Sequence, residues 1–165
     1  MELVDKNLFL WNVKLYFGKD TSVDAKKVVK DKAFMEQYEA EKTLSEELAK
    51  YARTNGKGQD YVLFEVKYHK NHPFQPPFIR VLTPRFVMYT GHVTVGGSIC
   101  FEFLTNNGWS PASSMETIIV QIRRTLIEGK ARIDFNNQNQ YTYEEAKEAF
   151  IRMANKYSFN IDNLV

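Results

Sequence analysis

The sequence predicts one α+β domain in which a small antiparallel sheet packs on helices. Three observations indicate this class: strand-like runs in the first half, capped helical patterns at the end, and a Pro- and Gly-rich stretch between them. With 165 residues, 44% of them hydrophobic and 14% aromatic, the chain can bury one sizeable core. We therefore expect a single domain over residues 1–165, built on an antiparallel meander of about four strands.

The strands are predicted from runs of aromatic and β-branched residues. Residues 8–17 alternate between apolar and other side chains in their second half. One side of that strand would carry Trp11, Val13, Leu15 and Phe17. Residues 60–69 and 78–82 give two further strands. Between them, residues 72–77 contain three prolines, which lack N–H donors, so we expect an extended and unpaired loop.

A helical insertion is predicted at about residues 24–53, between the first two of these strands. The segment is rich in Ala, Lys and Glu and meets few breakers before Asn55 and Gly56. Its apolar positions are loosely spaced, which favours one or two solvated helices that cover an edge of the domain. The mixed charges are typical of an ordinary solvated face.

Two helices close the chain, and each begins with a capping-box pattern. Ser113 and Glu116 frame the start of the first, which Gly129 ends. Thr142 and Glu145 frame the start of the second. Apolar residues recur at helical spacing after both boxes.

Charge and hydropathy narrow the classes of function. The 22 basic against 20 acidic side chains give a net charge of +2, which does not predict binding to nucleic acid or a membrane. No apolar run approaches the roughly 18 residues of a spanning helix, and the first five residues lack the pattern of a signal peptide. We expect a soluble intracellular protein of the cytoplasm, the nucleus or both.

Cys100 is the single cysteine, so the chain has no internal disulfide. Free cysteines are often buried as small hydrophobic residues, and this remains one interpretation. The alternative is a reactive thiol. Gly96 and Gly97 favour it, since paired glycines would let a bulky covalent partner or another backbone approach the sulfur.

Neither metal nor hydrolase chemistry is indicated around this thiol. Cys100 and the three histidines, His69, His72 and His92, form no Cys-x-x-Cys or His-x-x-x-His pair, so we expect no metal and no cofactor. A cysteine hydrolase would need a histidine and an orienting Asn or Asp. Such residues are present, but no hydrolase signature surrounds Cys100.

Three blocks of sequence resemble the core of ubiquitin-conjugating enzymes and come in the order of that family. They are residues 72–81 (HPFQPPFIRV), 96–100 (GGSIC) and 108–112 (GWSPA). The resemblance covers about residues 8–157. It is strongest to the Q-type branch, which is similar in the blocks PPFIRV, FLTNNGWS and GKAR. It implies a ubiquitin-conjugating-enzyme-like fold.

The resemblance also implies an activity and a set of partners. Cys100 would accept ubiquitin from an activating enzyme as a thioester and pass it to an acceptor amine of a protein substrate or to a ligase cysteine. Ubiquitin ligases would bind two loops, at Phe74 and at Ser110, Pro111 and Ala112. Trp109 would shield the cysteine loop and anchor the start of the next helix.

The chain departs from the family where most members carry His-Pro-Asn. Thr90-Gly91-His92 stands there, with His92 eight residues before the cysteine. His92 would donate to the oxyanion of the second transfer or hold the loop, with Thr90 and Gly91 in support. Asp134 lies at about the position of the family's proton acceptor for the incoming lysine, with a plain loop carboxylate as the alternative.

The start of the chain is a second departure. The family begins with an amphipathic helix that meets the activating enzyme, and residues 1–7 are too short to supply it. We expect that helix to be absent or trimmed. With the altered His-Pro-Asn position, this leaves one alternative function, a non-catalytic ubiquitin-binding variant of the same fold.

Overall fold

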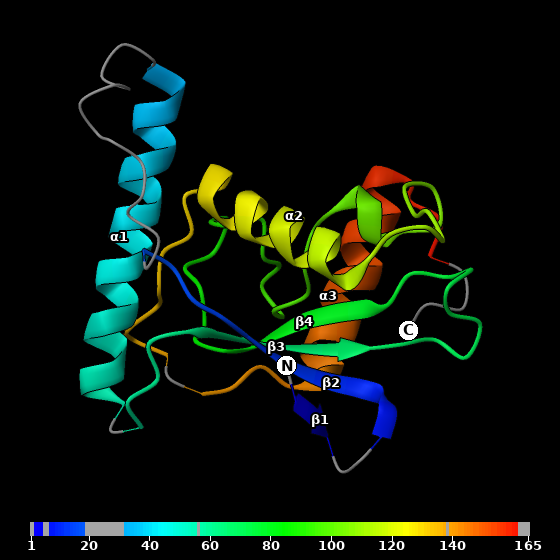
Figure 1. The fold of residues 1–165 in the computed structure, drawn as a ribbon, viewed down its shortest axis with the longest axis horizontal. Helices are drawn as coiled ribbons and strands as arrows, with labels where there is room; N and C mark the ends of the chain where they lie inside the picture. Colours follow the sequence, from blue (N-terminus) through cyan, green and yellow to red (C-terminus); the bar gives the residue numbers. More distant parts are fainter. Residues whose placement is uncertain (1, 5–6, 19–31, 56, 138, 162–165) are drawn as a thin grey trace.

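The computed structural model describes residues 2–4, 7–18, 32–55, 57–137 and 139–161, which form a four-stranded antiparallel sheet with helices on both sides (Figure 1). The strands lie in sheet order β1-β2-β3-β4. Their bounds are Glu2–Val4, Asn7–Leu15, Val62–Lys67 and Phe78–Thr83. The α+β class and the meander are therefore confirmed.

Pairing between β2 and β3 follows the predicted alternation. The register runs from Leu10 opposite Lys67 to Leu15 opposite Val62. Side chains on the inner face are buried, and Trp11 at the same face is half-buried. The buried members are Val13, Leu15, Val62, Phe64 and Val66. The first strand, β1, was not located by any sequence pattern, and it lies on the outer edge of β2.

The helix α1 (Lys32–Thr54) corresponds to the predicted insertion, whose first part, residues 24–31, lies outside the described residues. It buries only Leu44, Leu48 and Tyr51. In Figure 1, α1 stands at one side of the domain, next to the end of α2. The described part of the insertion is thus a single helix, and its three buried side chains join the main core cluster.

The two closing helices are α2 (Met115–Glu128) and α3 (Tyr143–Tyr157). The predicted cap of α2 was wrong by one residue. Ser114 is the N-cap and accepts from the Thr117 N–H, whereas the Ser113 N–H donates to Ser110 O. Gly129 is the C-cap, as predicted. For α3, the capping box of Thr142 and Glu145 is present with both of its hydrogen bonds.

The core lies on both faces of β4, and this determines where the site forms. Ile79 and Val81 belong to a large cluster with α1 and α2, while Phe78 packs against α3 with Phe150. β4 is therefore covered on both of its faces. A segment that pairs with the free edge of β4 lies between α2 and α3. Within the described part of the chain, the helices are too short or too polar to span a membrane.

Candidate active site around Cys100

Cys100 ends a short antiparallel hairpin. Val93 and Ile99 form a bridge, the Thr94 N–H donates to Ser98 O (2.9 Å), and the Cys100 N–H donates to His92 O (2.8 Å). The Thr94 hydroxyl closes the turn, since it accepts from the Ser98 N–H (3.0 Å). The backbone of the cysteine is therefore held by His92.

The same hairpin pairs with the free edge of β4. The Val81 N–H donates to Gly97 O (2.8 Å), and the Ile99 N–H donates to Ile79 O (3.3 Å). Arg80, opposite Ser98, is buried and pairs with Glu65 across the sheet (2.8 Å). The sheet thus continues up to the residue before Cys100 and leaves the thiol at its border.

Gly96 and Gly97 lie where other parts of the chain pack closely on the hairpin. A Cβ at Gly96 would overlap the Glu145 carbonyl oxygen, and one at Gly97 would lie 2.5 Å from the Tyr141 ring. The two glycines therefore let the hairpin pack closely on α3 and on Tyr141. The structure thus shows another part of the chain approaching the turn before Cys100, and the approach of a covalent partner to the sulfur stays a prediction.

The thiol of Cys100 is half-buried against the cluster that joins β4 to α3. Burial raises the pKa of the Cys100 thiol above its ordinary value, and the positive charge of Lys156 lowers it in part. The thiol is thus mainly protonated at neutral pH. Sequence reasoning missed Lys156; its position one turn beyond Met153, on the apolar stripe of α3, is the signal that could have found it.

Thr90 and Gly91 tie the start of the hairpin to the segment after α2. The Gly91 N–H donates to Gly129 O (2.7 Å), and the Thr90 hydroxyl accepts from the Arg132 N–H (3.2 Å). Gly91 is buried at a φ of +65°, and a Cβ there would lie 2.7 Å from that of Ala131. Both residues therefore support the loop that holds Cys100.

His92 contributes its backbone to this loop and exposes its imidazole. Its φ of +52° lies in the left-handed region, which few residues other than glycine, Asn and Asp adopt readily. The ring lies against Gly129, where a Cβ would meet the ring carbon Cδ2 at 2.7 Å. Within the described part of the chain, hydrogen bonds to His92 reach its carbonyl oxygen and not its ring.

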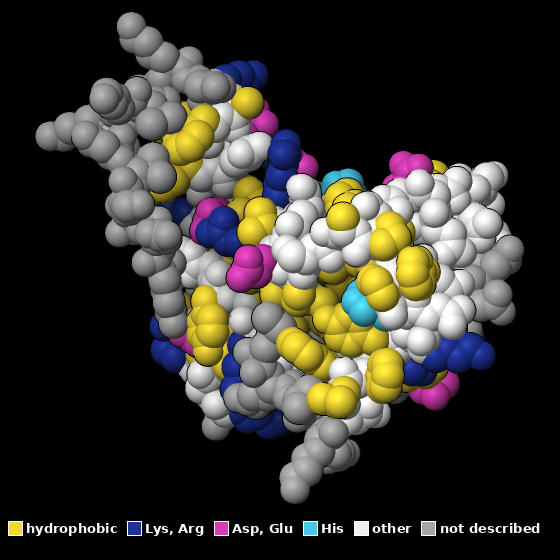
Figure 2. Space-filling model, turned by 45° about the vertical axis from the view of Figure 1, so that its right-hand side comes forward, with side chains coloured by type: hydrophobic (Ala, Val, Ile, Leu, Met, Phe, Trp, Pro, Cys, Tyr) yellow, Lys and Arg dark blue, Asp and Glu magenta, His cyan; other side chains and the backbone are white. Residues whose placement is uncertain are grey.

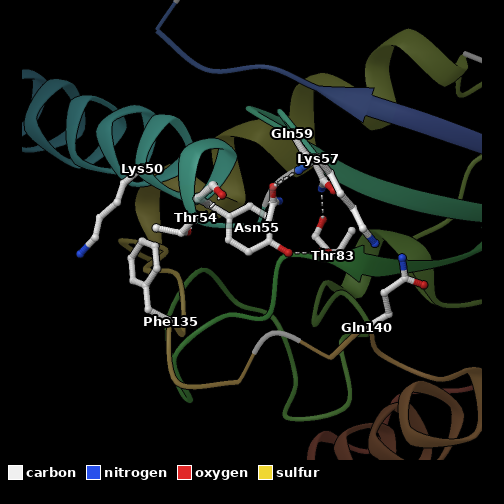
Figure 3. Close-up of a pocket in the computed structure, with 9 residues that line it drawn as sticks. Lys50, Thr54, Asn55, Lys57, Gln59, Thr83, Phe135 and Gln140 are labelled. Carbon is white, nitrogen blue, oxygen red and sulfur yellow. Dashed lines mark hydrogen bonds between the residues drawn. The ribbon is translucent and has the colours of Figure 1, made fainter.

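Asp134 lies in the segment that pairs with residues 85–86. Its carboxylate accepts from the Asn136 N–H (2.9 Å), and its own N–H donates to Arg85 O (2.8 Å). The next residue, Phe135, lies under Lys50 of α1, as Figure 3 shows. Asp134 therefore belongs to a segment docked beside α1, while Cys100 packs on α3.

The structure joins the two loops of the expected ligase-binding surface. The Trp109 indole N–H donates to Pro73 O (2.7 Å), which ties the Pro-rich loop to the loop before α2. Phe74 is 77% exposed, and the next loop contributes three exposed residues. These are Ser110, Pro111 and Ala112. Figure 2, which brings the right-hand side of Figure 1 forward, shows hydrophobic side chains gathered on this part of the surface.

Trp109 also belongs to a chain of ring contacts that crosses this end of the domain. It lies 6.0 Å from the His72 ring and 5.8 Å from the Phe103 ring, and Phe103 lies 5.9 Å from Phe101. Phe101 follows the cysteine directly. Trp109 thus anchors the segment that leaves Cys100.

Two cavities of about 420 Å³ lie away from Cys100. The one in Figure 3 lies beyond the end of α1 and is lined by polar groups, among them the Tyr51 and Thr83 hydroxyls, 2.7 Å apart. The other lies between α1 and residues 130–132. Among the described residues, no group of three or more His, Cys, Asp and Glu side chains is placed to hold a metal ion.

A comparison with known protein families identifies the family of this chain. The family described as ubiquitin-conjugating enzyme matches residues 57–158, and the chain belongs to that family. Within it, the chain is a member of the Q branch, because it is 37% identical over 151 residues to ubiquitin-conjugating enzyme E2 Q1 of Homo sapiens and of Mus musculus.

The relatives differ in how much of their own length is matched. The Q1 alignments cover 91% of this chain and 30% of each relative. Ubiquitin-conjugating enzyme E2Q-like protein 1 of Homo sapiens is 35% identical over 133 residues, which is 81% of this chain and 65% of that protein. The chain therefore spans less than a third of the Q1 relatives, and the family match begins after α1.

Proposed function

We propose that this chain accepts ubiquitin as a thioester on Cys100 and passes it to an acceptor amine or a ligase cysteine. The observation that carries the proposal is the position of Cys100, half-buried at the border of the sheet in a member of the ubiquitin-conjugating enzyme family. Family membership supports ubiquitin, an activating enzyme and a ligase as partners.

In the first transfer, the Cys100 sulfur attacks the carbonyl carbon of the thioester that the activating enzyme carries. A new S–C bond forms, the old one breaks, and the thiol of the activating enzyme leaves with the proton that Cys100 has lost. Because thiolate is the nucleophile, the raised pKa of Cys100 limits this step, and Lys156 favours it.

In the second transfer, an amine or a ligase thiolate attacks the thioester carbonyl, and negative charge develops on its oxygen. A prepositioned N–H donor stabilises that charge. We assign this role to the His92 imidazole, because its backbone already holds Cys100 and its ring is exposed. When the tetrahedral intermediate collapses, the S–C bond breaks and Cys100 leaves as a thiolate. An attacking amine gives up one proton, which the Cys100 thiolate takes up directly or through water, and the amide or new thioester is released.

The exposed Phe74 and the loop after Trp109 form the surface we assign to the ligase. An exposed aromatic side chain on a proline-stiffened loop is a suitable contact anchor. In Phe74→Ala we expect ligase-dependent discharge to fall while discharge to free lysine stays unchanged. Equal loss of both would contradict the assignment.

A loading assay tests the main proposal. The protein is incubated with activating enzyme, ATP and ubiquitin and then analysed on non-reducing and reducing gels. We expect an adduct that reductant removes and that Cys100→Ser does not form. An adduct that survives in Cys100→Ser with the same sensitivity to reductant would overturn the proposal.

The same experiment distinguishes the alternative function. The raised pKa of the thiol and the replaced His-Pro-Asn both favour a non-catalytic variant. If no adduct forms and the folded protein still binds free ubiquitin in a titration followed by NMR, the chain is a ubiquitin-binding protein of this fold.

A further inference from the structure

We propose that α1 positions the Cys100 loop through Glu47, so that the insertion controls transfer from a distance. The inference rests on the proposed function. The helix α1 precedes the segment that the family model matches, and Cys100 packs on the other side of the domain, against α3.

The first step is the contact between α1 and the segment after α2. Both carboxylate oxygens of Glu47 accept hydrogen bonds there, from Arg132 Nε (2.6 Å) and from the Ile133 N–H (2.7 Å). The Glu47 side chain is only 13% exposed. A largely buried carboxylate with one cationic and one backbone donor forms strong, directional hydrogen bonds, so Glu47 fixes the backbone at Ile133.

The second step leads from this segment to Thr90. The Arg132 N–H donates to the Thr90 hydroxyl (3.2 Å), which itself donates to Val87 O (2.8 Å). The Arg132 carbonyl accepts from the Val87 N–H (2.8 Å). The segment that Glu47 holds is thus paired along the turn that contains Thr90.

The third step leads from Thr90 to the cysteine. Gly91 follows directly and is bonded to Gly129, and the His92 carbonyl accepts the Cys100 N–H. Glu47 is therefore connected to the Cys100 backbone by three hydrogen bonds, at Ile133, Thr90 and Cys100, and by the short backbone segments 132–133 and 90–92 between them. A displacement at Ile133 changes the position of the thiol and of the His92 ring.

The hydrogen bonds from α1 to residues 130–133 come from Glu47, while Lys50, one turn further on, lies over the ring of Phe135 (4.4 Å). Nearer the start of α1, a cavity of about 420 Å³ separates the helix from residues 130–132. The pair between Glu36 and Lys130 is long, at 3.8 Å, and exposed. Within the described part of the chain, the polar contacts of Glu41 are with Arg123 of α2 and with the Gly18 N–H, and neither involves the Thr90 turn. Glu41 therefore provides a matched control on the same helix.

The test is single-turnover discharge of ubiquitin from the preloaded protein to free lysine, with the full chain and well below the melting temperature. In Glu47→Ala we expect discharge at saturating lysine to slow by about tenfold, while the lysine concentration for half-maximal rate changes little. Glu47→Gln, which keeps an acceptor for the Ile133 N–H, should restore most of the rate. Glu41→Ala should discharge ubiquitin at the wild-type rate.

A double substitution tests the connection itself. Thr90→Val removes the hydroxyl between Arg132 and Val87. If Glu47 acts through Thr90, the double variant Glu47→Ala with Thr90→Val will be no slower than the slower single variant. Effects that multiply would show two independent roles and would overturn the proposal, as would equal slowing in Glu47→Ala and Glu41→Ala.

A second readout needs no ubiquitin and separates this inference from the proposed function. The backbone amide resonance of Cys100 and its rate of alkylation by iodoacetamide both report the position of the thiol. We expect both to change in Glu47→Ala and to stay unchanged in Glu41→Ala. If the wild-type protein forms no thioester while the resonance and the alkylation rate still change in Glu47→Ala, the proposed function fails and the link from Glu47 to Cys100 stands. If neither signal changes in Glu47→Ala, the link is overturned.

Discussion

His92 combines a left-handed backbone with an exposed imidazole, and the two features have separable consequences. The backbone conformation suits glycine and asparagine better than other residues. A substitution by alanine would remove the ring and keep the strain of a side chain in this conformation. Glycine removes the ring without adding strain to the loop, and asparagine, which also tolerates this conformation, replaces the ring with another N–H donor.

This separation gives the first prediction. In His92→Gly we expect loading of Cys100 to stay intact and discharge to free lysine to slow by on the order of a hundredfold, the usual effect of losing one oxyanion donor. His92→Asn should retain most of the discharge rate. Quench-flow discharge of the loaded protein measures both. Normal discharge in His92→Gly would show that the ring has no part in the chemistry.

A second prediction concerns Lys156, whose charge opposes the effect of burial on the Cys100 thiol. Lys156→Gln should raise the pKa of Cys100 further and shift the pH profile of iodoacetamide alkylation to higher pH. At neutral pH we expect alkylation to slow by about twofold, as for loss of one exposed charge interaction. Lys147→Gln on the same helix is the control, and an equal shift there would argue against a specific effect.

Among single residues, the sequence predicted those that lie within a local motif. The blocks of sequence that resemble the family contain three of them: Cys100, Trp109 and Phe74. Asp134 was chosen from its position along the chain, and the structure places it beside α1. For Lys156 the sequence offers one signal, its place on the apolar stripe of α3. Glu47 acts on partners far away in the sequence, so no local pattern could have indicated its contacts.

Among the elements, α3 is fixed at its start by two sets of contacts. Thr142 and Glu145 form the capping box, and Arg85 reaches Glu145 with a bond of 2.8 Å. The Thr142 N–H, more than Arg85, holds the pKa of Glu145 below its ordinary value, against the effect of burial. This contribution to stability is present above the ordinary pKa of glutamate and is lost as the pH falls through the lowered one.

The third prediction follows from this cap. Thr142→Ala should lower the free energy of unfolding by about 1 kcal/mol. For a domain of this size, that corresponds to a fall in melting temperature of about 2 to 4 °C. Thr142→Ser, which keeps the acceptor oxygen, should unfold close to the unchanged protein. Thermal denaturation followed by circular dichroism gives the comparison, and equal loss in both variants would contradict the role of the hydroxyl.

Sequence patterns predicted the longer elements and failed on the short ones. β2, β3, α2 and α3 each carry a buried stripe at the period of the element, β4 is a short apolar run, and α1 was indicated by its content of Ala, Lys and Glu. β1 has three residues, too few for an alternation. The cap of α2 was misplaced because Ser113 and Ser114 are adjacent and both are good N-caps, and only the turn at Ser110 decides between them.

For the molecule as a whole, β4 lies between two clusters and the cysteine hairpin continues its sheet. The class and the single meander were predictable because they depend on composition and pattern. The packing of the hairpin on Tyr141 and α3 was not, since it depends on how closely two backbones approach. The same packing partly buries two titratable side chains, Cys100 and Tyr141.

The fourth prediction is a loss of stability at alkaline pH. Burial raises the pKa of both Cys100 and Tyr141 above their ordinary values of 9.0 and 10.0. The folded state therefore keeps protons that the unfolded chain releases first. Their contribution is fully present below the ordinary values and is lost as the pH rises through the raised ones. Urea unfolding at neutral pH and above pH 10 should show the loss, and Cys100→Ala should show less of it.

The close approach of Gly96 to the Glu145 carbonyl sets how tolerant this region is to change. Even one methyl group there would force the hairpin away from α3 and carry the sulfur with it. A saturation scan selected for thioester formation should therefore find alanine excluded at Gly96 and Gly97, while the exposed Glu102, nearer the nucleophile, accepts many side chains. Proximity to the reacting atom would then be a poor guide to which positions natural variation can alter.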